Sequence, residues 1–295
     1  MSKIDFHIHS IYSRDGEYTP EELIYLAKKA NLKALAITDH NTTKGVEEAI
    51  QSGKASNIEI IPAVELDCIH NGIVFHVLGY FIDHKSPKYF KIEENIYDQE
   101  IAASKHRIDL VRKMGIEIDD DEAFSRAKDG IVTGEIIAEI VLNDPSNANN
   151  PLLQPYFPGG IRADNPFVNF YWDYCSQGKP AYVHINYISM KEAISLIIET
   201  GGVPVLAHPG INLKGRTEIL DSLVKLGIKG MEAYSSYHSP EQNRYFIQQA
   251  QEYSLLITGG SDFHGKTKPS VFMGNFGLEQ DGMALFDTLK ALKNK

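Results

Sequence analysis

The sequence predicts an α/β fold with a parallel sheet covered by helices and interrupted by one inserted segment. Three observations lead to this prediction. Short apolar runs typical of buried strands alternate with helical segments near both ends of the chain. About 90 residues in the middle break that alternation. Several of the apolar runs end directly in histidine or acidic residues, which places polar chemistry at one edge of the sheet.

The composition is that of a globular protein with a substantial core. The chain has 295 residues, 43% of them hydrophobic and 23% charged, with a formal net charge of −10. This length suits a large domain carrying an insertion. An acidic chain without a long Lys/Arg run is not expected to bind duplex nucleic acid through a basic surface. The two cysteines form no CxxC pair and predict no disulfide framework.

No membrane partner is expected, and the default location is the cytoplasm. The N-terminal residues lack an apolar signal core, and no stretch reaches the roughly 20 apolar residues that span a bilayer. The oligomeric state is left open by the sequence.

The first part of the chain, residues 1–86, is expected to form the first half of the sheet. Strands are predicted at residues 3–6, 34–38, 58–64 and 73–78, the third ending before Glu65. Thr19 and Pro20 have the residue types of a helix cap and first turn, and a second helix is expected around residues 44–51.

The middle of the chain, residues 87–180, is expected to be an inserted, mainly helical cap. It holds an acidic run at 119–122, interpreted as a solvated face, and a loop rich in Asn and Pro between 143 and 166. Aromatic residues between 167 and 174 indicate packing rather than disorder.

The alternation returns in residues 181–295. Strands are predicted at 203–207, 230–234 and 255–259, and helices at 189–200, 217–226, 240–253 and 283–292. Residues 260–267 fit the phosphate-loop pattern G-x-x-x-x-G-K-T, but Asp262 inside the loop and Pro269 in the required helix argue against that reading.

Histidine, Asp and Glu side chains gather where these strands end. On an extended backbone alternate side chains share a face, so His7 and His9 can face one ion. Because strand ends meet on one face of a barrel-like α/β fold, nine residues would converge there. Burying them together without metal would be costly, and a set of N and O donors without thiolate suits Zn, Mn or Fe. They are His7, His9, Asp15, His40, Glu65, His76, His208, Asp262 and His264.

The same residues carry a resemblance to a known family. The chain resembles the PHP (polymerase and histidinol phosphatase) superfamily of metal-dependent phosphoesterases. The resemblance implies a distorted (β/α)7 barrel with a trinuclear metal centre. The long insertion resembles that of the subgroup acting on nucleotides and short oligonucleotides. The matching motifs are His7-x-His9 with Ser13-x-Asp15-Gly16, Thr38-Asp39-His40, Glu65-Leu66, His76, Ala207-His208-Pro209 and Gly260-Ser261-Asp262-Phe263-His264.

Carried over by position, the resemblance implies a ligand set for each of three divalent ions. The first ion would take His7, His9, Glu65 and Asp262. The second would share the bridging Glu65 and add His76 and His208, and the third would take Asp15, His40 and His264. Clustered cations lower the pKa of bound water and neutralise phosphoryl charge, so the expected nucleophile is a metal-bridging hydroxide held by Glu65. Asp39 has two open interpretations, orienting His40 or capping a helix.

Four residues are candidates for contact with the substrate. His238 follows a strand end, and the resemblance suggests a phosphate or leaving-group contact; the alternative is an incidental His beside a cap at Ser239. His184 follows the cap and could reach the substrate. Nucleotide-bisphosphate members carry cap arginines that grip a second phosphate, whereas residues 132–135 here contain none. Arg162 and Lys179 are then the cap cations to consider. Lys266 could touch a substrate phosphate, but it is expected to be solvated, and Glu232 is expected to be structural.

Two alternative functions stay open. A metal-dependent amidohydrolase or deaminase also begins with His-x-His on a barrel, but that family usually has a bridging carbamylated lysine, for which no strand end offers a candidate. Glu65 fills the bridging position instead. A non-catalytic metal-stabilised binding module would typically have lost ligands, and none of the nine is missing.

Overall fold

The structure is a computed structural model that describes residues 2–293. Its sheet runs in the order β1-β2-β3-β4-β6-β7-β8, and a short strand, β5, pairs with β3. A bridge between Ile8 and Phe263 joins the two edges, so the sheet is a nearly closed barrel, as predicted. The strands are β1 (Ile4–Ile8), β2 (Ala34–Ile37), β3 (Glu59–His70), β4 (Ile73–Tyr80), β5 (Ile188–Ser189), β6 (Val203–Leu206), β7 (Gly230–Ser235) and β8 (Leu256–Gly260).

The expectation of a wholly parallel sheet is wrong at β4. This strand is antiparallel to both of its neighbours, β3 and β6. The cause is the tight turn Asn71-Gly72, whose positive φ angles of 50° and 75° are those of a two-residue hairpin. Because β3 continues to His70, Glu65 lies inside the strand rather than after its end. His76 lies on β4, as expected.

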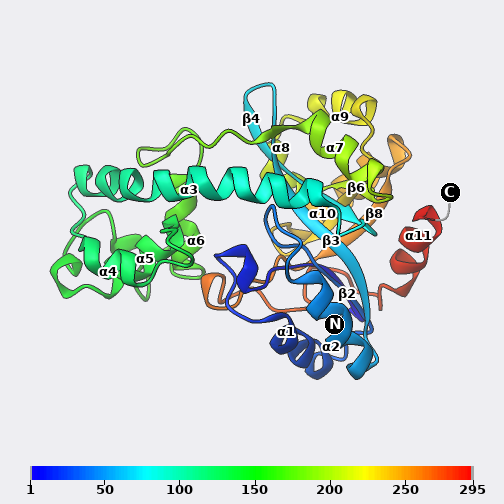
Figure 1. The fold of residues 1–295 in the computed structure, drawn as a ribbon, viewed down its shortest axis with the longest axis horizontal. Coiled ribbons are helices and arrows are strands. Elements are labelled where there is room, and N and C mark those ends of the chain that lie inside the picture. The colour runs from blue at the N-terminus through cyan, green and yellow to red at the C-terminus, as the bar shows by residue number, and fades with distance from the viewer. Residues whose placement is uncertain (1, 294–295) are drawn as a thin grey trace.

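Helices cover the outside of the barrel (Figure 1). The first begins at a capping box in which the Thr19 hydroxyl accepts from the Glu22 N–H at 3.2 Å and the Glu22 carboxylate accepts from the Thr19 N–H at 2.8 Å. The core includes Phe6, Tyr80 and Phe286, all buried. The covering helices are α1 (Pro20–Lys29), α2 (Val46–Ser56), α7 (Met190–Glu199), α8 (Pro209–Leu213), α9 (Leu220–Leu226), α10 (Pro240–Glu252) and α11 (Met283–Lys293).

The inserted segment is mainly helical and lies to one side of the barrel (Figure 1). The long helix α3 (Pro87–Lys113) runs out from the barrel, and α4 (Asp120–Ser125), α5 (Gly134–Asn143) and α6 (Pro166–Phe170) gather at its far end. A hydrophobic cluster that includes Ile137 and Phe170 is drawn from residues 108–181 alone. The division into 1–86, 87–180 and 181–295 stays a prediction, and residues 1 and 294–295 lie outside the described part.

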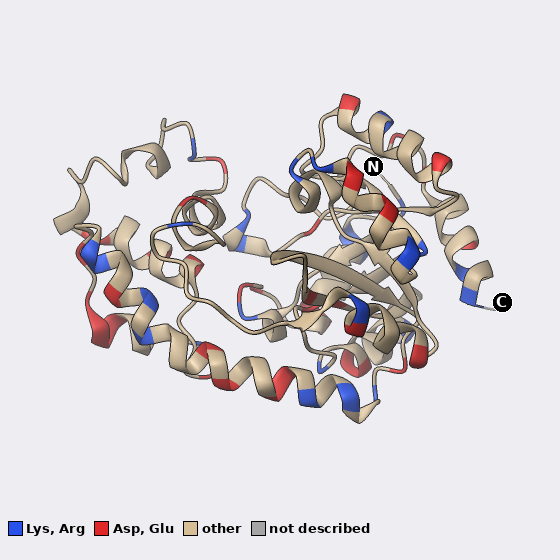
Figure 2. Ribbon diagram, turned by 90° about the horizontal axis from the view of Figure 1, so that it is seen from above, with Lys and Arg blue, Asp and Glu red and all other residues tan. Residues whose placement is uncertain are grey.

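The charges of the inserted segment are mixed in sign, and Figure 2 shows acidic and basic residues interspersed along α3. In the predicted acidic face, Asp119 caps α4 by accepting from the Glu122 N–H, while Asp120 binds Lys105 and Arg112. Cys68 and Cys175 are buried and unpaired. Among the described helices, none combines the length and the apolar character needed to cross a bilayer.

Candidate metal centre

Four buried side chains meet where β1, β3 and β8 come together. The Nε2 atoms of His7, on β1, and His9, just after it, lie 3.1 Å apart, since alternate residues of an extended backbone share a face. Glu65 Oε2 lies 3.1 Å from His7 Nε2 and 3.2 Å from His9 Nε2. Asp262 Oδ1 lies 3.3 and 3.1 Å from the same two nitrogens. These four donor atoms therefore surround one point, as the predicted ligands of a first ion would.

The second oxygen of Glu65 belongs to a different group. Glu65 Oε1 lies 3.1 Å from His76 Nδ1 and 3.2 Å from His208 Nε2. One carboxylate thus presents an oxygen to each of two histidine pairs. This is the placement that a bridging ligand requires.

A third group lies toward the inserted segment. Asp15 Oδ2 is 3.1 Å from His264 Nε2 and 3.9 Å from His40 Nε2. His9 also lies within reach of this group. Ser13 connects the groups, because its hydroxyl contacts His9 Nδ1 at 2.9 Å and accepts from the His40 N–H at 3.1 Å.

The donor set fits divalent metal ions. Several buried polar atoms of the centre have no hydrogen-bond partner in the described structure, among them Asp15 Oδ1 and His264 Nε2. Leaving such atoms unsatisfied is costly, and a bound cation would satisfy them. Four groups of His, Asp and Glu donors have their ligand atoms within 4.8 Å of one another. The residues therefore suit a metal centre, whereas the number and identity of the ions stay a proposal.

Outer contacts hold three of the imidazoles so that Nε2 faces the centre. His7 Nδ1 lies 3.0 Å from Glu232 Oε1, His9 Nδ1 contacts Ser13, and His264 Nδ1 lies 2.9 Å from the carbonyl oxygen of Asp262. In metal sites the outer nitrogen of a ligating histidine is usually bonded in this way.

The electrostatics keep Glu65 and His9 in the states that bind metal, whereas for His40 burial is outweighed by the carboxylates of Glu65 and Asp67, which raise its pKa to about 10. Burial raises the pKa of Glu65, but the nearby imidazoles of His7, His40 and His76 hold it well below its ordinary value. Burial, followed by the neighbouring His264, lowers the pKa of His9 to about 4. Glu65 is therefore ionised and His9 neutral near neutral pH, as metal ligation requires.

Sequence reasoning undervalued Glu232 and did not identify Lys268. Glu232, expected to be structural, accepts from the His208 N–H at 2.8 Å as well as contacting His7. The signal for it was a carboxylate in an otherwise apolar strand. Lys268 is buried, and its Nζ lies 2.6 Å from Asp262 Oδ2, which the Tyr237 hydroxyl also contacts. Nothing in the sequence pattern pointed to this lysine.

Asp39 has a different role from both of the interpretations given above. Its two carboxylate oxygens accept from the N–H and the hydroxyl of Ser10, each at 2.6 Å. It therefore fixes the loop that follows β1. The cap residue of α2 is Gly45, without a side-chain cap.

The predicted substrate contacts differ in where they lie. His238 Nε2 accepts from the Gly210 N–H at 3.0 Å, and its Nδ1 lies 3.1 Å from the Ala233 carbonyl oxygen, so both ring nitrogens are engaged by backbone. Ser239 does cap α10. His184 and Lys179 are exposed, and neither lines the two cavities beside the centre.

Arg162 lies at one of these cavities but is already paired. Its guanidinium contacts both oxygens of Asp173, at 2.9 and 3.0 Å. The cavity that it lines measures about 410 Å³ and includes Tyr237, whose hydroxyl contacts the predicted ligand Asp262.

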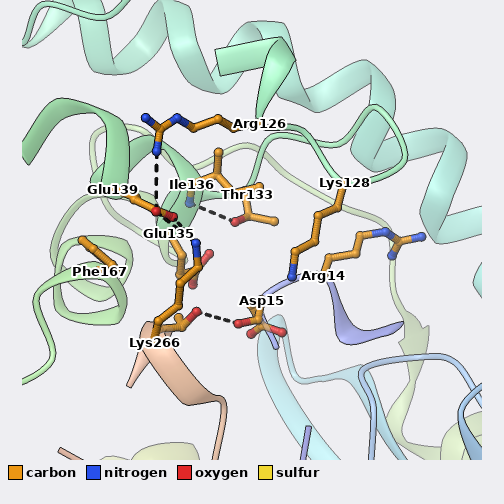
Figure 3. A pocket seen from close by; sticks show the side chains of 11 residues that line it. Arg14, Asp15, Arg126, Lys128, Thr133, Glu135, Ile136, Glu139, Phe167 and Lys266 are labelled. Carbon is orange, nitrogen blue, oxygen red and sulfur yellow. Dashed lines mark hydrogen bonds and ion pairs between the residues drawn. The ribbon is translucent and has the colours of Figure 1, made fainter. Parts of the chain in front are cut away.

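The other cavity, of about 320 Å³, opens beside Asp15 and gathers four cations (Figure 3). Lys128 reaches from the inserted segment toward Asp15, whereas the Arg14 guanidinium points away from Asp15 and lies over the Tyr97 ring. Arg126 and Lys266 both pair with Glu139, at 3.5 and 2.8 Å. Lys266 is half exposed, as expected of a solvated lysine, and its ammonium pairs with Glu139. The cap cations beside the centre are Arg126 and Lys128, a few residues before the stretch in which the sequence offered no arginine.

Comparison with known proteins places this geometry in context. Residues 5–133 match the family model described as PHP domain. The phosphoribosyl 1,2-cyclic phosphate 1,2-diphosphodiesterase of Eggerthella lenta is 27% identical, over 89% of this chain and 94% of the relative. The 3′,5′-nucleoside bisphosphate phosphatase of Chromobacterium violaceum is 28% identical, over 90% of this chain and 88% of the relative.

A further relative, the 5′-3′ exoribonuclease of Haemophilus influenzae, is 28% identical over 89% of this chain and 90% of its own length. Among solved structures, an amidohydrolase from Chromobacterium violaceum with bound sulfate has a TM-score of 0.80 at 24% identity, covering 98% of this chain and 96% of the other. At that identity the structural likeness bears on the fold alone, and it agrees with the barrel and inserted segment described above.

Proposed function

The chain belongs to the PHP superfamily of metal-dependent phosphoesterases, and we propose that it hydrolyses a phosphate ester of a nucleotide or short oligonucleotide. The observation that carries this proposal is the position of Glu65, whose two oxygens face two different groups of histidines. A carboxylate so placed suits a multinuclear centre, the kind of site that serves in-line displacement at phosphorus.

Three divalent ions, Zn, Mn or Fe, would be held by the nine predicted ligands. When bound, such ions supply a hydroxide nucleophile near neutral pH and neutralise charge on the phosphoryl oxygens. The contribution of the chain is to orient the donors. Glu232 and Ser13 fix His7 and His9, and Asp262 presents one oxygen while Lys268 holds the other.

The cation-rich cavity supports a substrate with more than one phosphate. Lys128 reaches toward Asp15, so an anion there would be next to the third predicted ion site. Glu139 offsets part of the charge of Arg126 and Lys266, which leaves Lys128 as the cation to meet an incoming phosphate. The relatives named for a bisphosphate phosphatase and an exoribonuclease act on substrates of this kind.

The alternative of an amidohydrolase is less well supported by the geometry. A bridging carbamylated lysine would have to lie between the metal groups. Lys268 is the buried lysine beside the centre, and its Nζ pairs with the outer oxygen of Asp262 at 2.6 Å. The position between the groups is taken by Glu65.

The proposal is tested by phosphate release from a panel of substrates, measured with Zn-, Mn- and Fe-loaded protein. The panel holds AMP, adenosine 3′,5′-bisphosphate, short RNA and DNA oligonucleotides, histidinol phosphate and bis-p-nitrophenyl phosphate. N-acetyl amino acids and adenosine test for amidohydrolase and deaminase activity. We expect turnover of a nucleotide or oligonucleotide that EDTA abolishes and that Asp262→Asn lacks.

Two results would overturn the proposal. One is turnover of an amide or of adenosine with none of the phosphate esters. The other is phosphate release that neither EDTA nor Asp262→Asn diminishes, because activity of that kind would not come from this centre. Glu241→Gln, an exposed carboxylate on α10, serves as the matched control for the loss of one negative charge.

A further inference from the structure

We propose that Asp67 is a positioning residue that couples two metal sites, because one of its oxygens faces two histidines predicted to bind different ions. Asp67 is not among the nine predicted ligands. The inference rests on the metal centre proposed above and deepens it.

The contacts of Asp67 carry the argument. Its Oδ1 lies 3.2 Å from His76 Nε2 and 3.4 Å from His40 Nδ1. In each ring the other nitrogen faces a predicted ligand. His76 Nδ1 lies 3.1 Å from Glu65 Oε1, and His40 Nε2 lies 3.9 Å from Asp15 Oδ2. Asp67 thus lies behind the His76 ring, whereas on His40 it shares Nδ1 with Glu65 Oε2, which is also 3.4 Å away.

The carboxylate is itself held in place. The Asn41 side-chain amide donates to Asp67 Oδ2 at 2.7 Å, and the Asp67 N–H donates to Asn41 Oδ1 at 2.9 Å. The Asn41 N–H in turn donates to the Glu65 carbonyl oxygen at 2.8 Å. Because Glu65 and Asp67 are alternate residues of β3, their side chains lie on one face of the strand. Asp67 is 9% exposed and Asn41 4%.

This arrangement selects the tautomers of both histidines. Asp67 Oδ1 and His40 Nδ1 have no hydrogen-bond partner in the described structure, so their contacts are ion-pair contacts. Because an ionised carboxylate only accepts hydrogen bonds, we expect the nitrogens that face Asp67 to carry the protons once metal is bound. The lone pairs then lie on His76 Nδ1 and His40 Nε2, directed at the centre.

The consequence is a specific pattern of metal loss. Removing a carboxylate behind a ligating histidine typically weakens metal binding about 10- to 100-fold. Without Asp67 we expect that loss at the second and third sites together. The first site, formed by His7, His9, Glu65 and Asp262, gains no orientation from Asp67 and should keep its affinity.

The test compares metal binding by Asp67→Asn with that of the wild type. Titration calorimetry measures the affinities, and metal analysis after dialysis counts the ions that stay bound. The side-chain amide of the new asparagine has one NH₂ group in place of a carboxylate oxygen. Whether this group faces Asn41 or the two histidines, a donor then meets a donor and one of the two sets of contacts is lost. Asp83→Asn, an exposed position, is the matched control. We expect the wild-type protein and the control to bind three ions, and Asp67→Asn to keep one at unchanged affinity while the other two weaken at least about tenfold.

A second readout distinguishes positioning from a general loss of structure. Long-range ¹⁵N–¹H spectra of the zinc-loaded protein report which nitrogen of each histidine carries the proton. In the wild type we expect the proton on Nε2 of His76 and on Nδ1 of His40. Asn41→Ala keeps the carboxylate but removes its support, so it should weaken the same two ions to a smaller extent, even where Asp67→Asn does not fold.

Three results would overturn the inference. Asp67→Asn could bind all its ions with wild-type affinity, or Asn41→Ala could weaken the first ion as much as the others. The wild-type spectra could also show a proton on the inner nitrogen of either ring, as they would where Asp67 itself bound an ion. A wild-type protein that binds no ions would instead overturn the proposed function, so the two failures are distinguishable.

Discussion

Lys268 Nζ lies 2.6 Å from Asp262 Oδ2, and the two side chains are only 7% and 5% exposed. The Tyr237 hydroxyl contacts the same oxygen, while Asp262 Oδ1 faces the Nε2 atoms of His7 and His9. Burial raises the pKa of Asp262, but Lys268 and His264 hold it well below its ordinary value. The outer oxygen is thus saturated by protein groups, and the inner one is left to a metal ion.

Replacing Lys268 by methionine should therefore destabilise the metal-free protein. Breaking a buried ion pair on one side leaves an uncompensated charge and costs about 3–5 kcal/mol. Urea unfolding in EDTA measures this cost. Lys266→Met is the control, since Lys266 is half exposed and its pair with Glu139 should contribute no more than about 1 kcal/mol. Equal losses for the two variants would contradict a special role for Lys268.

The cation-rich cavity predicts a change in substrate preference for Lys128→Met. Its ammonium reaches toward Asp15 and contacts the Gly16 carbonyl oxygen, at the junction of the inserted segment and the barrel. Loss of one charged contact with a second phosphate should lower kcat/KM for a nucleoside bisphosphate about tenfold, or about 1.4 kcal/mol. Hydrolysis of bis-p-nitrophenyl phosphate, which has no second phosphate, should change much less. A uniform decrease for both substrates would argue against a phosphate subsite.

Glu135 should make the stability of the metal-free protein depend on pH. Burial, with a smaller effect from Asp15, raises the pKa of Glu135 from 4.5 to about 7. Because the folded-state value is the higher one, the protonated carboxyl stabilises the fold fully below about pH 4.5. That contribution is lost as the pH rises to about 7, by roughly 3 kcal/mol at most.

The measurement is the free energy of unfolding in EDTA from pH 4.5 to 8, for the wild type and for Glu135→Gln. The glutamine cannot ionise, so the free energy of unfolding of the variant should rise relative to that of the wild type as the pH rises. Glu139→Gln is the matched control on the same helix, one turn further along. If the difference in the free energy of unfolding were constant over this range, ionisation of Glu135 would not destabilise the folded protein.

Removing metal should lower the thermal stability of the protein. A ligand that binds only the folded state, present at 100 times its Kd, contributes about 2.7 kcal/mol. The effect is measured as the fall in Tm on adding EDTA to metal-loaded protein. His9→Ala, which removes a donor from the first group, should show a smaller fall, and an identical fall would place the stabilising ion elsewhere.

Most of the strands and the gathering of the nine predicted ligands could be predicted because apolar runs and strand ends are local features of the sequence. The antiparallel β4 could also have been predicted, since Asn71-Gly72 is the residue pair of a two-residue hairpin. The contacts of Lys268 and Glu232 could not, because they arise only when the barrel closes. Glu232 and His7 are 225 residues apart in the chain. Lys128 likewise lies near Asp15 only because of the way the inserted segment folds back on the barrel. The hydrophobic periodicity of the sequence does not predict that arrangement.

Because β1 and β8 pack closely where the barrel closes, Gly260 should not tolerate a larger residue. A methyl group there would lie 2.3 Å from His7 Cβ and 2.6 Å from the His7 nitrogen, so β1 would have to move away from β8. The Asp262 N–H donates to the His7 carbonyl oxygen at 2.8 Å, and this movement would pull apart two predicted ligands of one ion. Gly260→Ala should therefore cost about 1–3 kcal/mol of stability and also weaken the first metal site.

Gly72→Ala is the control that separates these two effects. Gly72 has a φ of +75° and nothing within 4 Å of an added methyl group, so alanine there meets only backbone strain, of about 1 kcal/mol or more. Denaturant unfolding of both variants measures the loss of stability, and metal titration measures the loss of metal affinity. Gly72→Ala should lose stability with unchanged metal affinity, whereas Gly260→Ala should lose both. Unchanged metal affinity in Gly260→Ala would mean that the close approach of β1 and β8 serves packing and does not position His7.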